Sequence, residues 1–177
     1  MLRGSRPSPH IVVRYEIQLS DPWVRESSHP YHLELRDAGA EGERARVLGC
    51  AAAERAARRA ARTLVDDMKS HGLDPSGAAI VARSFVDPRR VTGAHPRAHA
   101  AERKLYCESV RAALEECGVP VLALEEKRVR SAAAERLGRS AKQLDEMLKQ
   151  FVRGVGTPWR APEKHAALAA WISLPDK

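Results

Sequence analysis

Two short apolar runs limit the folds open to this chain more than any other feature. They read GAAIVARSFVDP at 77–88 and VPVLALEEK at 119–127, and turn-forming residues bound both of them. Bounded apolar runs of this length are typical of buried strands. Between them, residues 89–100 have the composition of a loop, and residues 99–117 carry apolar side chains at helical spacing. A strand, a helix and a second strand in this order predict parallel neighbours in a sheet that helices cover.

The first third of the chain predicts three more strands and a helix. Residues 10–21 are β-rich and partly alternate between apolar and polar side chains, and residues 31–35 show a similar pattern. Residues 45–50 fit either a short strand or the start of a helix, and their Val-Leu-Gly sequence favours the strand. Residues 51–71 place apolar side chains on one face at spacings of three and four, which predicts a helix.

Three more helices complete the expected chain. The segment VRSAAAERLGRSAKQLDEMLKQF (129–151) predicts helices at 130–137 and 140–151 with a break at Gly138, and the last helix begins near Pro162, a favourable first-turn position. The order β-β-β-α-β-α-β-(α-α)-α is that of the ribonuclease H-like fold. We therefore expect an α/β protein with a mixed five-stranded sheet that is flanked by helices.

Length and composition agree with one domain in an ordinary reducing compartment. The chain has 177 residues, and we expect a flexible lead at 1–9 followed by a single domain at 10–177, with two small domains as the alternative. Its three cysteines, Cys50, Cys107 and Cys117, include no C-x-x-C pair, which argues against a disulfide framework and a structural zinc site. No apolar run approaches a membrane span, and no apolar signal core follows the basic N-terminus. These features predict a cytoplasmic protein without a membrane partner.

The charge of the chain indicates a polyanionic partner. Its 30 Lys and Arg residues outnumber 23 Asp and Glu residues and give a net charge of +7 at pH 7. A surplus of this kind favours polyanions such as nucleic acid or anionic lipid. The alternative is a GC-rich genome that uses arginine freely, in which case the surplus has no functional meaning.

The C-terminal half carries a resemblance to a known family. The segment GRSAKQLDEML has a glycine, a small residue, a lysine, a glutamine, an aliphatic residue and a methionine in the order found in RuvC-type Holliday-junction resolvases, which have the ribonuclease H-like fold. RAALEECGVPVLALEEKRVRSAAAERLG and PEKHAALAAW resemble the family's second helix with the strand after it and its last helix. The residues that match the first segment are Gly138, Ala141, Lys142, Gln143, Leu144 and Met147.

This resemblance implies a metal-dependent nuclease that acts on structured DNA or on RNA, and a homodimer. Such enzymes hold Mg²⁺ or Mn²⁺ with converging acids. On the first strand Asp21 is the best match, with Glu16 as the alternative register. Glu163 and His165 open the last helix, and Asp87 lies beyond the fourth strand. The metal ligands implied are Asp21 and His165.

Each of these residues also has a structural interpretation. Asp21 precedes a proline, which is typical of a turn, and Glu163 near a helix start complements the helix dipole. The fourth strand has Val-Ala-Arg where the family has a glutamate, and Glu125 ends the neighbouring strand. If Arg83 has replaced that acid, a cation there repels Mg²⁺ and attracts phosphate, so that a cutting site becomes a holding site.

Basic residues are candidates for phosphate contacts because they surround the expected carboxyl ends of the fourth and fifth strands, where ligands bind on open α/β sheets. The candidates are Arg83, Arg89, Arg90, Lys127, Arg128, Arg130, Arg139 and Lys142. His95 and His99 are four residues apart and could form a metal pair on a helix, but Pro96 between them favours a loop.

Three functions are therefore open. The first is the metal-dependent nuclease, and the second is a non-catalytic relative that binds nucleic acid or a protein partner. The third is a helix-turn-helix DNA binder at residues 130–150. Lys142 and Gln143 would serve such a binder, whereas Asp145 and Glu146 would repel phosphate.

Overall fold

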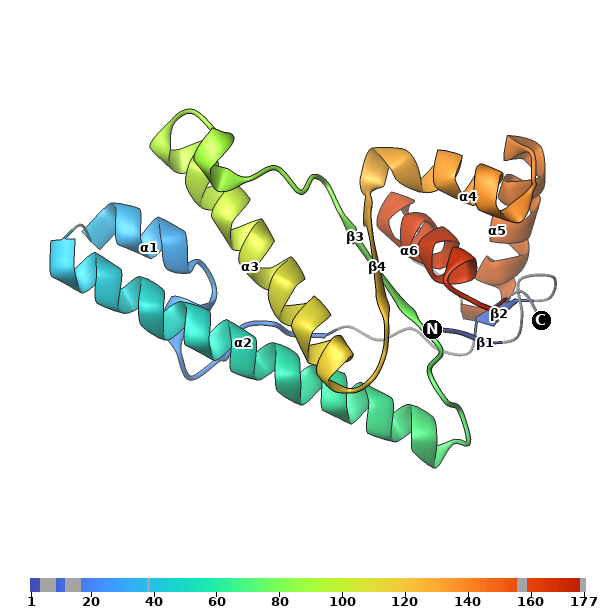
Figure 1. Cartoon of the computed structure of the whole chain (residues 1–177), viewed down its shortest axis with the longest axis horizontal. Helices are drawn as coiled ribbons and strands as arrows, with labels where there is room; N and C mark the ends of the chain where they lie inside the picture. Colours follow the sequence, from blue (N-terminus) through green and yellow to red (C-terminus); the bar gives the residue numbers. More distant parts are fainter. Residues whose placement is uncertain (4–8, 12–16, 38, 156–158, 176–177) are drawn as a thin grey trace. The chain divides into compact units, whose positions relative to one another are not determined.

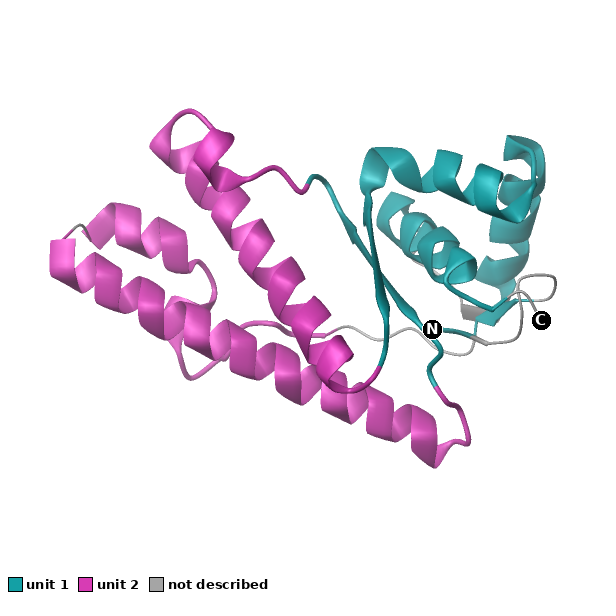
Figure 2. Cartoon of the chain, viewed as in Figure 1, with its two compact units in different colours: residues 1–16, 75–84, 119–177 teal, residues 17–74, 85–118 magenta. Residues whose placement is uncertain are grey.

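The computed structural model describes residues 1–3, 9–11, 17–37, 39–155 and 159–175. Helices make up 67% of the structure. The chain divides into two compact units, each assembled from separate stretches of sequence (Figure 2). Unit 1 comprises Met1–Glu16, Pro75–Ser84 and Val119–Lys177, and unit 2 comprises Ile17–Asp74 and Phe85–Gly118.

The regular elements among the described residues of unit 2 are all helices. The helices α1, α2 and α3 pack against one another (Figure 1). Two short 3-10 turns precede α1 and α3. The elements are η1 (Arg25–Ser27), α1 (Pro30–Asp37), α2 (Gly39–Ser70), η2 (Pro88–Arg90) and α3 (Ala94–Glu116).

Small residues explain how these helices approach one another closely. The buried stripe of α2 is almost entirely glycine and alanine, from Gly42 and Gly49 to Ala61, and only Val65 is larger. Alanine is the strongest helix former, and it also lets neighbouring backbones come near. The same composition that stabilises a 32-residue helix therefore produces a thin, closely packed unit.

Unit 1 contains the strands. β3 (Ala78–Ala82) and β4 (Val121–Glu125) form a two-stranded parallel sheet, in which Ala78 pairs with Val121 and Ala82 with Glu125. β1 (Leu2–Arg3) and β2 (His10–Ile11) form a short antiparallel pair. After η3 (Glu126–Arg128) come the helices α4 (Val129–Leu137), α5 (Ala141–Val155) and α6 (Ala161–Ile172).

The core of unit 1 is centred on its three helices. Trp171 and Leu168 of α6 are fully buried, and α6 packs against both β3 and α4. The ring of Phe151 on α5 meets that of Trp171 edge to face, with centroids 5.7 Å apart and an interplanar angle of 76°. Offset aromatic pairs of this kind are favourable. The helices α4 and α5 are thereby held in place by α6.

The prediction of a five-stranded ribonuclease H-like sheet is wrong. Among the described residues the larger sheet has two strands, and six helices dominate the structure. The expected strand at 31–35 lies inside α1, and the expected strand at 45–50 lies inside α2. Of the expected strand at 10–21, His10–Ile11 pairs with β1, residues 17–21 are not a strand, and residues 12–16 lie outside the described residues.

Helix propensity explains the misassigned strand at 45–50, and packing against α2 explains the one at 31–35. Residues 45–50 contain a single β-branched residue and continue directly into the alanine-rich stretch, so the helix extends backwards through them. At 31–35 five alternating residues resembled a strand, but Pro30 begins a helix there, and Glu34 pairs with Arg46 of α2 at 2.9 Å. The alternating pattern at 31–35 predicted a strand, but packing against α2 determined that this segment is helical.

Most of the remaining elements confirm the sequence predictions, but residues 94–100, which were expected in a loop, form the start of α3. The helix predicted at 51–71 lies within α2 apart from its last residue, and both apolar runs contain parallel strands. The helices predicted at 130–137 and 140–151 are α4 and α5. The three cysteines are free and half-buried. None of the described helices combines the length and apolar composition that a membrane span requires.

Tyr106 of α3 is hydrogen-bonded to the turn that precedes α1. Its hydroxyl donates towards the carbonyl oxygens of Ser27 and Ser28, both 2.7 Å away. Burial, and then the carboxylate of Glu102, raise the pKa of Tyr106 to about 12. The folded protein therefore favours the protonated phenol.

We expect Tyr106→Phe to lower the free energy of unfolding by about 1 kcal/mol at pH 8, because a partly buried hydrogen bond is lost. Above pH 10 the unfolded chain releases the phenol proton before the folded chain does, so this contribution falls as pH rises from 10 to about 12. Urea denaturation at pH 8 and pH 11 measures both effects. A difference between wild type and variant that stays constant over this range would contradict the assignment.

Candidate nucleic-acid interface

The most sharply defined surface feature of unit 1 is the turn between α4 and α5. Gly138 adopts a left-handed conformation, with φ 60° and ψ 36°. The N–H of Gly138 donates to the carbonyl of Glu135 at 3.3 Å, and the N–H of Arg139 donates to that of Ala134 at 3.1 Å. This pair of bonds is the Schellman motif that ends many helices. Glycine is required because the left-handed region is strained for other residues.

The start of α5 is equally well defined. The N–H of Ser140 donates to the amide oxygen of Gln143 at 2.8 Å, and the N–H of Gln143 donates to the hydroxyl of Ser140 at 3.3 Å. This reciprocal capping box satisfies two donors that a helix start otherwise leaves unpaired. Two helices joined by a three-residue turn containing glycine have the connection of a helix-turn-helix motif, and they leave the turn in different directions (Figure 1).

The two faces of α5 differ completely in chemistry. Leu144, Leu148 and Phe151 are buried, with exposed fractions of 1%, 2% and 5%. At 3.6 residues per turn, three basic positions and the acidic Glu146 fall opposite this buried face. The three basic positions form a line about 16 Å long, at 1.5 Å of rise per residue, and Glu146 lies within it between the first two. The residues of this basic line are Lys142, Lys149 and Arg153, and all are exposed.

The charge of the chain is concentrated in this segment. Residues 127–155 contain eight Lys and Arg residues and three Asp and Glu residues. Their net charge of +5 accounts for most of the +7 of the whole chain. The remaining residues are nearly balanced. A general excess of arginine does not produce such segregation, so the charge argument of the sequence now applies to a particular pair of helices.

One of the two acids of α5 is neutralised. The guanidinium of Arg130 on α4 lies 2.6 Å from a carboxylate oxygen of Asp145. The hydrogen bond from Arg130 lowers the pKa of Asp145, so its carboxyl is ionised and paired near neutral pH. The pair also ties α4 to α5. Arg130 was expected to contact phosphate, but its geometry is that of a structural link, and Glu146 is the exposed acid that remains on α5.

Three other basic candidates of unit 1 follow the ends of the parallel strands, whereas Arg139 lies in the turn between α4 and α5. Arg83 follows β3 and is exposed, and its preceding residue pairs with Glu125 at the end of β4. Lys127 approaches Glu125 at 3.1 Å. Arg128 is exposed at the start of α4, whereas Arg139 stacks over Trp171 at 5.7 Å from the ring centroid. This edge of the sheet therefore mixes charges of both signs.

Glu163 and His165 lie on α6 in unit 1. Glu163 accepts the N–H of Arg160 at 2.9 Å, which is a helix-start interaction. The Nδ1 of His165 is buried and lies 3.3 Å from an oxygen of Glu126, yet it makes no hydrogen bond among the described residues, because the contact lies off the direction a hydrogen bond needs. His165 thus has one acidic neighbour at the end of the strands.

Asp21 and Asp87 lie in unit 2 and occupy turns. Asp21 accepts the N–H of Trp23 at 3.0 Å and approaches Arg59 at 3.5 Å. Asp87 accepts the N–H of Arg89 at 3.0 Å, and this bond is the main cause of its lowered pKa. Arg89 and Arg90, which were expected to contact phosphate, are exposed within η2. Each unit thus holds two of the four residues predicted as catalytic.

Sequence reasoning missed part of the basic line. Lys149 and Arg153 were not predicted, although their positions seven and eleven residues after Lys142 follow the helical period and could have been found that way. The sequence analysis also favoured a loop over a metal-binding helix for His95 and His99, which both lie on α3.

The known proteins give no assignment for this chain. No protein-family model matches it, and neither the curated proteins nor the solved structures contain a significant match. The resolvase resemblance therefore rests on the quoted segments alone, and the fold that it implies is not the one observed.

Proposed function

We propose that this protein binds duplex DNA through α4, the turn at 138–140 and α5. The observation that carries the proposal is the basic line on the solvent face of a helix whose other face is locked into the core. A rigid helix with exposed cations is suited to a polyanionic surface. The capping box and the Schellman motif fix the turn, so the two helices present one surface.

The geometry favours duplex DNA over duplex RNA. The major groove of B-form DNA admits an α-helix, whereas the major groove of A-form RNA is too deep and narrow for side chains to reach. The second helix of a helix-turn-helix pair is the one that enters the groove, and here that helix is α5. Its basic line, about 16 Å long, is comparable in length to several phosphates along one strand.

We infer that binding depends mainly on the DNA backbone. Lysine and arginine contacts to phosphate position a protein without reading sequence. Gln143, at the start of α5, is committed to the capping box and is not available to a base edge. The affinity should therefore depend strongly on salt and weakly on sequence.

DNA cleavage forms no part of this proposal. Glu163 and Asp87 each accept a backbone N–H at the start of a helical turn, and Asp21 does the same within its own turn. These contacts give each carboxylate a structural role. Incubation of labelled duplex and branched DNA with Mg²⁺ or Mn²⁺ tests this point, and specific cleavage lost in Asp21→Asn would support the nuclease instead.

The double variant Lys142→Gln, Lys149→Gln removes two charges from the proposed DNA-binding surface. Each lost phosphate contact should weaken binding roughly tenfold near 0.1 M salt, so we expect about a hundredfold loss. The slope of log affinity against log salt should become shallower by about 2. Fluorescence anisotropy with a labelled 30-base-pair duplex at several salt concentrations measures both quantities.

A matched control removes the same charge elsewhere. Lys69 and Lys104 are exposed lysines on α2 and α3 of unit 2, and their double substitution by glutamine lowers the net charge by the same 2. It should change affinity less than threefold, since net charge alone has little effect. Equal losses in the two double variants would show that the surface on α5 is not the interface.

A further inference from the structure

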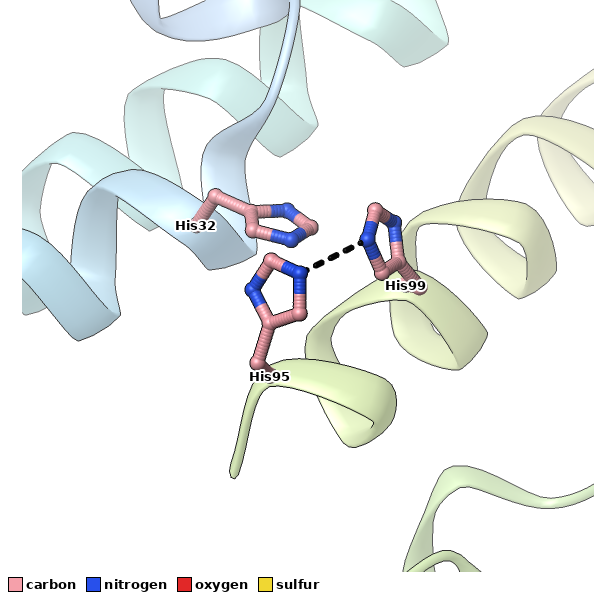
Figure 3. A group of neighbouring side chains, drawn as sticks. All are labelled: His32, His95 and His99. Atoms are coloured by element: carbon pink, nitrogen blue, oxygen red, sulfur yellow. Dashed lines mark hydrogen bonds between the residues drawn. The ribbon is translucent and has the colours of Figure 1, made fainter. Parts of the chain in front are cut away.

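Three histidines of unit 2 converge at one point. His32 comes from the first turn of α1, and His95 and His99 come from the first two turns of α3 (Figure 3). Their ring centroids are 4.3 to 4.8 Å apart. One ligand atom from each ring lies within 4.8 Å of the other two. Because all three belong to the same compact unit, this arrangement is local to it.

Two of the rings already have the spacing of metal ligands. The Nε2 atoms of His95 and His99 are 3.1 Å apart and share a hydrogen bond (Figure 3), which an ion bound to both would replace. Two nitrogens bound to one tetrahedral ion at 2.0–2.1 Å lie about 3.3 Å from each other. The spacing of four residues places both rings on one face of a helix. Pro96 does not prevent this, because it lies in the first turn of α3, where its missing N–H has no helical partner.

A buried carboxylate, that of Glu102, orients His32 as a metal ligand. Its Nδ1 lies 2.8 Å from an oxygen of Glu102, whose side chain is only 7% exposed. The same carboxylate also accepts the backbone N–H of His32 at 3.3 Å. A proton held on Nδ1 leaves the lone pair on Nε2, which is the tautomer that binds a metal. Metal-bound histidines commonly have this carboxylate partner.

The Nε2 of His32 is itself the clearest sign of a missing ligand. This atom is buried and makes no hydrogen bond with any described residue. A buried polar atom without a partner costs free energy, and such atoms call for an explanation. A bound cation on the side of His95 and His99 supplies the missing partner.

We propose that His32, His95 and His99 bind one zinc-class divalent ion through their Nε2 atoms. Imidazole nitrogens suit zinc and its neighbours among the transition metals, whereas Mg²⁺ prefers oxygen ligands. Three protein ligands leave the fourth tetrahedral position to water or to another small ligand. The ion links α1 to α3 and is independent of the surface proposed for DNA.

A second grouping, of His29, His32 and Glu102, serves as support for this site and not as the site itself. In that grouping the Nδ1 of His32 is already engaged with Glu102, and the Nδ1 of His29 lies 3.5 Å from the other carboxylate oxygen. Glu102 therefore acts as a positioning residue. It holds one histidine and is approached by another, and it does not need to touch the ion.

Isothermal titration of the full chain with Zn²⁺ tests the proposal. We expect one ion per chain, an affinity at least tenfold lower in His95→Ala and in His99→Ala, and no saturable binding in the double variant. Both side chains are exposed, so the far-UV circular dichroism should not change. His71→Ala, which removes an exposed histidine at the end of α2, is the matched control and should bind as wild type.

Two further measurements separate ligation from general stability. Co²⁺ bound at the site should give the absorption bands of tetrahedral coordination, and Mg²⁺ should not compete. Glu102→Ala should lower zinc affinity by roughly 10- to 100-fold, and Glu102→Gln should recover part of it because its amide oxygen still accepts the Nδ1 proton. Wild-type affinity in the His95, His99 double variant, or no saturable binding by wild type, overturns the proposal.

Discussion

Gly49→Ala should destabilise the protein by about 1–3 kcal/mol, even though alanine is the better helix former. Gly49 is buried within α2 at its closest approach to η1 and α1. A Cβ built there overlaps the carbonyl oxygen of Glu26 and lies 2.8 Å from the Cβ of Pro30. The obstacle is mainly backbone, which moves only if the start of α1 moves with it. The gain of about 1 kcal/mol in helix propensity offsets only part of this cost.

Gly42→Ala provides a graded comparison within the same helix. There the nearest atom to an added Cβ is the carbonyl oxygen of Glu34 at 2.8 Å, a milder overlap than at Gly49. We expect a smaller loss of stability, and urea denaturation monitored by circular dichroism measures both variants. If Gly49→Ala raised stability, as propensity alone predicts, the close packing of α2 described above would be incorrect.

The elements predicted correctly from the sequence are those that local signals determine. The runs at 77–88 and 119–127 are apolar and bounded by turns, and both contain strands. The break at Gly138 was predicted from the glycine itself, and the structure explains it by a left-handed glycine and a Ser-x-x-Gln capping box that lie within six residues. Signals that act between neighbours in the chain can be recognised without knowing the fold.

The errors have a different origin. The strand predicted at 31–35 depended on five alternating residues, and its outcome was decided by packing against α2. With that strand and the one at 45–50 included, the predicted order of elements matched a ribonuclease H-like fold. The resemblance to the resolvases and the predicted topology then supported each other, although neither had been tested independently. The charge pattern, in contrast, depended on neither assumption.

The histidine cluster could not be predicted from the sequence. His32 precedes His95 by 63 positions, and only the packing of α1 against α3 brings them together. The pair His95 and His99 had the spacing of metal ligands, but Pro96 indicated a loop. That interpretation required knowing where α3 begins, and helix ends are the least predictable part of a helix.

Trp171→Ala should cost about 3–5 kcal/mol, the largest loss among the single substitutions considered. Trp171 is fully buried and is the largest of the completely buried side chains. Its replacement leaves a cavity between α5 and α6 and removes the edge-to-face contact with Phe151, which contributes about 0.5–1.5 kcal/mol beyond burial. The guanidinium of Arg139 also loses the ring beneath it.

Two comparisons make this prediction specific. Trp23→Ala removes the same side chain at a position that is 93% exposed, and it should change stability by less than about 0.5 kcal/mol. Trp171→Phe keeps an aromatic ring against Phe151 and should cost less than the alanine variant. Chemical denaturation of the three variants gives these values. Similar losses for Trp171→Ala and Trp23→Ala would mean that α6 does not form the core on which α4 and α5 are held, and the rigid surface proposed to bind DNA would lose its support.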